Sequence, residues 1–427
     1  MRISTYTFGC KVNQYETQAI EELLKERGHS IVPFGEICDV CIINTCSVTA
    51  ESDRKAREQI RRAKKYSKYV ALCGCYSQTH EEEAYKLLEA DVVIGSANKG
   101  QIVDLVSNLP QKVHAVSDIM KEKEFEILPA GRFADRTRAL LKVQDGCTNF
   151  CTYCIIPYAR GRVRSMPLDN AIKEVKRLTA EGAKEIVLTG IEISSYGRDF
   201  KDNTDIKTLI TEVCRAAGDC RIRLGSLEPR TIDEDFIEKI KDLKNLCPHF
   251  HLSMQSGSDT VLCRMGRKYD TERFYKSVKL LYDNIENCAI TTDMIVGFPQ
   301  ESEEEFSQSL TFIKKCGFAK MHIFPYSRRE GTKAYSMDGQ LTKAEKSQRA
   351  SVAIRVAEEM SREYNRSMVG KTLSVLFETE HNGMFEGHSE NYLEVLSYGE
   401  NLKGKLCNVK ITDVKDGKLI GKINGAE

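Results

Sequence analysis

Three cysteines lie close together near the middle of the chain: Cys147, Cys151 and Cys154. Their CxxxCxxC spacing falls on one loop that directly follows a predicted strand. Thiolate is the preferred ligand of iron–sulfur clusters, so this loop can hold three irons of a [4Fe–4S] cluster and leave the fourth iron open. A zinc site is the alternative. Structural zinc sites close with four ligands, however, and no histidine or fourth cysteine follows nearby.

Three further cysteines, Cys10, Cys46 and Cys75, each follow a predicted parallel strand. Ligands of open α/β sheets bind where the carboxyl ends of the strands meet, so three neighbouring loops can bring these thiols together. A second three-cysteine cluster is one interpretation, and three buried core cysteines is the other. Cys73 is the main rival of Cys75 as the third ligand, although its position within a strand favours packing.

The chain holds sixteen cysteines in all. It has no long apolar segment and no secretory signal at its N-terminus, so we expect a cytoplasmic protein without a membrane span. Disulfides are rare in that reducing compartment. Cys38 and Cys41 are therefore expected to be packing residues.

The charge is balanced: Lys+Arg is 63, Asp+Glu is 62 and the net charge is +1. This balance excludes a strongly basic nucleic-acid coat but allows local basic patches. Residues 54–68 are rich in Lys and Arg, and form either a phosphate-binding patch or a solvated helix face. Arg160, Arg162 and Arg164 follow the cysteine loop and are expected to approach an anionic substrate. The histidines show no metal-ligand spacing, so we expect structural roles for them.

The elements that must position these residues fall into three units, two of α/β type followed by one of β type. In the first 120 residues, strand and helix patterns alternate, with a strand over Arg2–Phe8, a helix over Gln14–Arg27 and a fourth strand over Val92–Gly95. This alternation favours a doubly wound parallel sheet. The polar, irregular stretch Met120–Arg138 is a candidate linker.

The second unit, residues 133–367, is expected to form a partial (β/α)6 barrel with its chemistry at the strand carboxyl ends. Its predicted strands are Leu140–Val143, Glu185–Leu188, Arg221–Leu224, Phe250–Met254, Ala289–Val296 and Lys320–Phe324. The third unit, residues 368–427, holds about five short strands separated by glycines, which predicts a small antiparallel β-barrel.

A CxxxCxxC loop after the first strand of a β/α array resembles the radical S-adenosylmethionine (SAM) superfamily. The resemblance implies that SAM chelates the open iron and is cleaved there to a 5′-deoxyadenosyl radical. Segments at the later strand ends also resemble the SAM-binding strands of the superfamily. The SAM contacts implied are Tyr153, Gly190, Glu192, Ser226, Gln255 and Gly297.

The chain as a whole resembles the methylthiotransferases of that superfamily. The resemblance implies three domains: an N-terminal methylthiotransferase domain over 1–120, a radical SAM domain over 133–367 and a TRAM domain over 368–427. It also implies that Cys10, Cys46 and Cys75 hold an auxiliary cluster, giving two [4Fe–4S] clusters in all. The implied partners are a tRNA anticodon stem-loop and an electron donor protein of flavodoxin or ferredoxin type, and nothing in the sequence demands more than a monomer.

Residues 7–16, which include Lys11 and Val12, are similar to the branch that converts N6-threonylcarbamoyladenosine at tRNA position 37 to its 2-methylthio derivative. In the family's mechanism one SAM methylates a sulfur on the auxiliary cluster. The radical from a second SAM attacks carbon 2 of the adenine, and the methylthio group is then transferred to that carbon. Two other branches remain alternatives. One acts on isopentenyladenosine and usually has Gln-Met at these two positions, and the other acts on a ribosomal-protein aspartate. The third alternative is a non-enzymatic RNA-binding protein with structural or redox metal sites.

Overall fold

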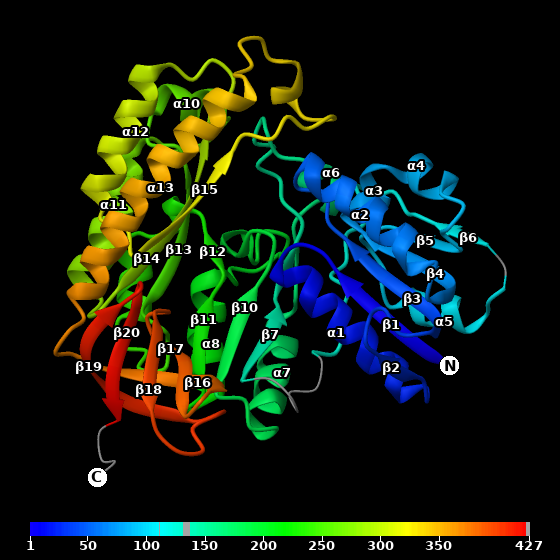
Figure 1. Ribbon diagram of the computed structural model, residues 1–427, viewed down its shortest axis with the longest axis horizontal. Coiled ribbons are helices and arrows are strands. Elements are labelled where there is room, and N and C mark those ends of the chain that lie inside the picture. Colours follow the sequence, from blue (N-terminus) through cyan, green and yellow to red (C-terminus); the bar gives the residue numbers. More distant parts are fainter. Residues whose placement is uncertain (111, 131–136, 424–427) are drawn as a thin grey trace.

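The computed structural model describes residues 1–110, 112–130 and 137–423, and it consists of three units packed side by side (Figure 1). The expected α/β fold class is confirmed. The predicted start of the second unit at residue 133 lies outside the described residues. So do part of the candidate linker and the last four residues of the chain. The described part of the linker contains no helix or strand before Arg138.

The N-terminal unit is a six-stranded sheet in which all neighbours are parallel, in the order β2-β1-β3-β4-β5-β6. The sequence predicted four of these strands and missed β2 and β6, which have only three residues each and no clear periodicity. The strands are β1 Arg2–Thr7, β2 Ser30–Val32, β3 Cys38–Thr45, β4 Ser67–Gly74, β5 Val92–Ile94 and β6 Val113–Ala115. The helices are α1 Lys11–Glu26, α2 Ala50–Ala63, α3 Cys75–Thr79, α4 Glu81–Lys86 and α5 Gln101–Ser107.

Strand β3 explains why this sheet is covered on both faces. Val40 and Ile42 pack into one core cluster, and the alternate residues Cys41 and Ile43 pack into the other. Successive side chains of a strand point to opposite faces, so a continuous apolar run requires helices on both sides. The carboxyl ends of β1, β3 and β4 are thereby fixed next to one another.

The central unit contains six parallel strand positions in sequential order, as expected for a partial barrel, but they form two sheets. The first sheet has the order β11-β10-β7 and the second has the order β12-β13-β14-β15. The division falls at Gly225, between β11 and β12. The strands are β7 Arg138–Lys142, β10 Glu185–Thr189, β11 Arg221–Leu224, β12 Ser226–Leu227, β13 His249–Gln255, β14 Ala289–Val296 and β15 Lys320–Pro325, with the short pair β8 Gln144–Asp145 and β9 Arg164–Ser165.

Helices cover the outer side of these strands (Figure 1). Two of them begin with a capping box, formed by Ser302 with Glu305 and by Thr342 with Glu345, which satisfies the first backbone N–H groups. The helices are α6 Ile156–Arg160, α7 Leu168–Ala180, α8 Ile206–Ala217, α9 Glu234–Ile240, α10 Asp259–Arg264, α11 Thr271–Asn284, α12 Glu303–Cys316 and α13 Lys343–Arg366.

The C-terminal unit is a closed five-stranded barrel in the order β16-β17-β18-β20-β19. The expectation of an antiparallel barrel was wrong for one pair, because β18 and β20 run parallel to close it. The strands are β16 Thr372–His381, β17 Met384–Ser389, β18 Glu394–Tyr398, β19 Leu406–Lys415 and β20 Lys418–Ile423.

Arginines of β7 and β11 join this barrel to the central unit. Arg138 donates to both carboxylate oxygens of Glu378 at 2.8 and 2.9 Å. Arg223 donates to the carbonyl oxygen of Glu390 at 2.9 Å while also pairing with Glu185. Burial opposes ionisation of Glu378, but His388 and Arg138 hold its pKa at about 2.

We expect acid to weaken this junction. A carboxylate whose pKa is depressed in the folded protein contributes stability above its ordinary pKa of about 4.3, and that contribution is lost as the pH falls toward about 2. Glu378→Gln should therefore lower the free energy of unfolding by about 1–3 kcal/mol at pH 6 and by roughly half as much at pH 3. Melting curves of cluster-free protein from pH 6 to 3 measure this difference. The exposed Glu400→Gln is the control, and equal acid sensitivity of wild type and Glu378→Gln would contradict the prediction.

Candidate functional site

The central cysteines lie on the loop between β8 and α6, at the carboxyl end of the first central strand. Cys151 is buried, and Arg267 donates to its Sγ at 3.2 Å. Burial raises the pKa of the Cys147 thiol to about 11 and that of Cys154 to about 12, and the three thiols lie near enough for their charges to interact. Both thiols are protonated at neutral pH without a metal, so iron must displace protons as it binds.

The N-terminal cysteines come from three neighbouring strand ends. Cys10 caps α1, Cys46 follows β3, and Cys75 begins α3 directly after β4. The charges of Cys75 and Cys10 both act on the Cys46 thiol. The structure thus brings together the three residues that the sequence predicted as one ligand set.

Two glycines allow this approach. Gly9 has a φ of +93°, and a Cβ on it would lie 2.8 Å from the Sγ of Cys46. Gly74 has a φ of +101°, and a Cβ there would lie 2.5 Å from the carbonyl oxygen of Thr45. Only glycine combines this backbone conformation with the space available. Each glycine directly precedes a candidate ligand, so both loops are built to hold their cysteines near Cys46.

Cys73 and Cys75 have different surroundings although they are two residues apart. Cys73 packs among the apolar side chains of the sheet core, with Ile3 and Ile42. Cys75 accepts a hydrogen bond from Nε of Arg160 at 3.4 Å. Cys38 and Cys41 are also buried in the core. The geometry favours Cys75 over Cys73 as the ligand.

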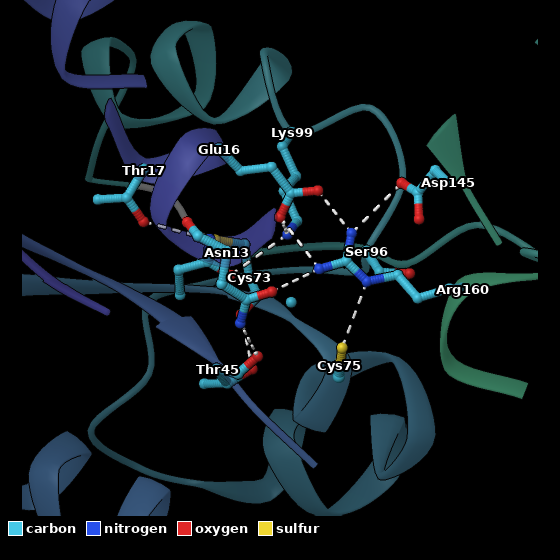
Figure 2. Close-up of polar contacts among 12 residues, drawn as sticks. Asn13, Glu16, Thr17, Thr45, Cys73, Cys75, Ser96, Lys99, Asp145 and Arg160 are labelled. Atoms are coloured by element: carbon cyan, nitrogen blue, oxygen red, sulfur yellow. Dashed lines mark hydrogen bonds and ion pairs between the residues drawn. The ribbon is translucent and has the colours of Figure 1, made fainter. Parts of the chain in front are cut away.

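A buried network of charges lies beside Cys75 (Figure 2). Glu16 of α1 accepts from Arg160 at 2.5 Å, from Lys142 at 2.9 Å and from Lys99. Asp145 accepts from Lys142 at 2.6 Å and also lies within ion-pair distance of Arg160. Arg160 further donates to the side-chain oxygen of Asn13 at 2.5 Å. The network joins the N-terminal unit to the central unit. The first supplies Asn13, Glu16 and Lys99, and the second supplies Lys142, Asp145 and Arg160.

This network corrects one expectation from the sequence. Arg160 is fully buried and Arg164 is 3% exposed, and both lie within ion-pair distance of Asp145. Neither side chain faces an incoming substrate. Arg162 alone of the three is exposed. The sequence could not reveal the pairing, because the partner Glu16 lies far away along the chain.

The first of two cavities, with a volume of about 540 Å³, opens beside the central cysteines. Cys154, Tyr153 and Gln255 line it, together with residues of the loop before α2. Tyr326 also lines this space, and its buried hydroxyl has no hydrogen-bond partner among the described residues. Gln255 has a φ of +70°, a conformation that costs energy in a non-glycine residue and is concentrated at functional sites.

The second cavity, of about 720 Å³, lies where all three units meet. The first unit supplies Cys10 and Lys11, the central strand ends supply Gly190 and Ser226, and the C-terminal barrel supplies Tyr392. Asp293 and Phe324 line both cavities, so the two spaces adjoin. A molecule in the second cavity therefore lies beside Cys10 and next to the first cavity, which Cys154 lines.

Two of the predicted SAM contacts line neither cavity. Glu192 lies close enough to Cys147 to influence its pKa, and its Oε1 has no partner among the described residues. Gly297 is buried against Lys346. It directly follows β14, the strand that carries the cavity-lining residue Asp293.

The sequence missed a group of polar residues in the wall of the second cavity. Asp293 of β14 lies between His251 and His322, at 3.3 and 3.1 Å. Burial opposes ionisation of Asp293, but hydrogen bonds from both imidazoles lower its pKa. His249 lines the same cavity, and the structural role expected for it and for His251 stays a prediction. The only signal for these residues was their position on adjacent predicted strands.

The donor sets and cavities fit the groups that the sequence analysis implied. Each set offers three thiols at the end of a parallel strand, and the first cavity has the size of an ordinary small-ligand pocket. Tyr153, Gln255 and Asp293 bring polar side chains to the lining of that cavity. Among the described residues, no helix has the length and apolar character needed to cross a membrane.

Two family models match the chain. The model of the "Radical SAM superfamily" matches residues 141–313, and that of "Uncharacterized protein family UPF0004" matches residues 2–95. The first match contains the CxxxCxxC loop, and the second contains all three N-terminal candidate ligands.

Characterised relatives match over nearly the full chain. A threonylcarbamoyladenosine tRNA methylthiotransferase of Bacillus subtilis is 40% identical over 420 residues, which cover 96% of this chain and 93% of the relative. A tRNA-2-methylthio-N(6)-dimethylallyladenosine synthase of Alkaliphilus oremlandii is 34% identical over 431 residues, covering 98% and 91%. A radical S-adenosylmethionine methyltransferase of Kitasatospora setae, solved with cobalamin and a [4Fe–4S] cluster, shares the fold with a TM-score of 0.58 at 12% identity, covering 90% of this chain and 80% of that one.

Proposed function

We propose that this chain, which belongs to the tRNA methylthiotransferase family of radical SAM enzymes, converts N6-threonylcarbamoyladenosine at tRNA position 37 to its 2-methylthio derivative. The observation that carries the proposal is the pair of adjoining cavities, which share Asp293 and Phe324 and open on one cysteine set each. Methylthiolation needs radical generation and sulfur delivery at opposite sides of one adenine. The choice of substrate rests on the Bacillus subtilis relative, at 40% identity.

The cofactors in this proposal are SAM and two [4Fe–4S] clusters. Cys147, Cys151 and Cys154 would hold one cluster, and Cys10, Cys46 and Cys75 would hold the other. When bound, these groups supply the electron, the radical and the sulfur of the reaction. Tyr153 and Gln255 line the space for SAM, and Gly190 and Ser226 border it from the second cavity. The proposal also includes Glu192 and Gly297, which line neither cavity, as SAM contacts predicted from the sequence.

The side chains around the two cavities orient the reactants and exclude water. Arg267 and Arg160 each donate an N–H to a thiol, of Cys151 and Cys75 respectively, which fixes both loops and favours ionised sulfur. Tyr392 lines the second cavity, with the His388 ring stacked against it and the Arg223 guanidinium over it. RNA readers commonly take unpaired bases that have left their stack, so the adenine would leave the anticodon-loop stack to enter the cavity.

The remaining parts of the proposal concern partners and organisation. The anticodon stem-loop is the partner, and the basic stretch 54–68 is a candidate for phosphate contacts outside the cavities. An electron donor protein of flavodoxin or ferredoxin type would reduce the enzyme. We place the domains at 1–120, 133–367 and 368–427, and infer a monomer that works where tRNA is found, in the cytoplasm.

The test is mass spectrometry of nucleosides from total tRNA of cells with and without this protein. Loss of the methylthio derivative, with its unthiolated precursor accumulating, is the expected result. Loss of a methylthiolated isopentenyladenosine would instead assign the chain to the branch that acts on isopentenyladenosine. Unchanged tRNA nucleosides, with SAM cleavage intact, would point to the ribosomal-protein substrate.

Metal analysis separates the enzyme from a non-catalytic RNA-binding protein. Two four-iron clusters correspond to about eight irons per chain and as many sulfides after anaerobic purification. Zinc without sulfide would favour a structural metal site instead.

A further inference from the structure

One amino group in the second cavity lacks a counter-charge. Lys11 lines this cavity directly after Cys10, and its ammonium stands 5.9 Å from the centre of the Tyr392 ring. Within residues 1–110, 112–130 and 137–423, no carboxylate lies within ion-pair distance of it. Arg223 and Arg138 repel its charge, and Glu185, which attracts it, already pairs with Arg223.

The other basic groups around the cavity are already paired. Lys320 lies 3.5 Å from Glu394, and His388 lies 2.5 Å from Glu378. His251 and His322 share Asp293. The exception besides Lys11 is His249. It is 6% exposed, and its Nδ1 has no partner in the described part of the chain although Nε2 contacts the Thr291 hydroxyl at 3.1 Å. The ring of His249 lies 4.9 Å from that of Tyr392, beside the Lys11 ammonium.

The proposed substrate carries the complementary groups. In threonylcarbamoyladenosine the carbamoyl group joins N6 of adenine to the amino nitrogen of threonine, which leaves a free carboxylate and a hydroxyl. Carbons 2 and 6 both flank N1, so the N6 substituent extends from a position close to the reacting carbon. If carbon 2 faces the cysteine set that includes Cys10, the substituent reaches the same wall of the cavity.

We propose that Lys11 is a specificity-determining residue that binds the free carboxylate of the N6-threonylcarbamoyl group. The inference rests on the proposed function and deepens it. A charge-assisted hydrogen bond in a partly desolvated cavity changes affinity by about tenfold to a hundredfold. An unpaired ammonium gives no such gain to a neutral N6 substituent, so Lys11 would distinguish the two kinds of modified adenosine.

The test compares anticodon stem-loop RNAs that differ only at position 37. One carries threonylcarbamoyladenosine, the second carries its neutral threonine amide, and the third carries isopentenyladenosine. Dissociation constants are measured by fluorescence anisotropy with the cluster-loaded enzyme, for wild type, Lys11→Gln, Lys11→Arg and the control Lys320→Gln. Iron content and circular dichroism establish that each variant is folded and loaded.

Wild type should bind the carboxylate RNA about tenfold or more tightly than the amide RNA. Lys11→Gln should bring this ratio close to one, Lys11→Arg should keep most of it, and Lys320→Gln should leave it within about twofold of wild type. A ratio that survives in a folded Lys11→Gln enzyme would overturn the assignment. The proposed function would still stand if wild type methylthiolates the carboxylate RNA, and would fall if it acts only on the isopentenyladenosine RNA.

Discussion

Cys151→Ala should abolish SAM cleavage, whereas Cys46→Ala should leave cleavage largely intact and stop formation of the methylthio product. The reason is the separation of the two thiol sets, since Cys151 lies on the loop beside the first cavity and Cys46 lies at the end of β3 in another unit. Each variant should retain about half of the cluster iron, near four atoms per chain. The measurements are 5′-deoxyadenosine by chromatography, with a chemical reductant supplied, and the modified nucleoside by mass spectrometry.

Two other cysteines serve as matched controls. Cys263 is exposed, so Cys263→Ala tests the loss of a thiol at the surface. Cys73 is fully buried two residues before Cys75, so Cys73→Ala tests the effect of a small core cavity beside the site. Both should keep iron and product. Full methylthio product from Cys46→Ala would show that Cys46 is no ligand. Loss of product from a folded Cys73→Ala variant with half of its iron would show that Cys73, and not Cys75, is the third ligand.

Both cysteine sets could be predicted from the sequence because their positions depend on local features. The CxxxCxxC spacing places three thiols on one loop whatever surrounds it. Cys10, Cys46 and Cys75 follow apolar runs that form parallel strands, and Gly9 and Gly74 permit the close approach at that edge. The end of a buried parallel strand is marked where a continuous apolar run gives way to turn residues, which is visible in a single sequence.

The residues between the cysteine sets could not be predicted, because their roles depend on contacts between distant segments. Arg160 is expected at the surface, since arginine is almost never fully buried unless it is paired. Its partner Glu16 comes from the first helix, and nothing near either residue indicates the pair. Tyr392 and Lys11 likewise meet only after the third unit docks on the central strands. Sequence periodicity fixes the elements but not which loops face each other across a cavity.

Glu16→Gln should destabilise the protein more than any exposed charge substitution. Glu16 is fully buried and accepts from Arg160, Lys142 and Lys99, which are themselves buried. Glutamine keeps the size of the side chain and one acceptor oxygen but removes the charge. Arg160 and Lys142 then have Asp145 as their carboxylate partner, and Lys99 has none among the described residues. Breaking a buried ion pair in this way typically costs about 3–5 kcal/mol. Thermal melting followed by circular dichroism measures the loss, since the chain contains no tryptophan to report by fluorescence.

The control is Glu51→Gln, which removes the partner of Arg54 on the exposed face of α2. Solvent and salt screen such a surface pair, so the melting temperature of this variant should barely change. A second variant tests the mechanism directly. Adding Lys99→Met to Glu16→Gln removes one of the ammonium groups left without a partner. The double variant should therefore lose less free energy of unfolding than the two single variants lose together, by about 1 kcal/mol or more. Strict additivity would mean that the loss at Glu16 arises from packing and not from uncompensated charge.

The same network makes a prediction about acid and about iron. Burial opposes ionisation of Glu16, but Arg160, Lys142 and Lys99 hold its pKa well below the ordinary value. A depressed folded pKa means that its contribution is complete above about pH 4.3 and is lost as the pH falls, so Glu16→Gln should flatten the acid side of the stability curve. Arg160 also donates to Cys75, and Glu16 holds Arg160 in that position. Glu16→Gln should therefore lose iron faster than wild type when a chelator is added, and it should lose it from the Cys75 cluster first. Equal rates of iron loss would separate the stabilising role of Glu16 from any role in positioning the cluster ligand.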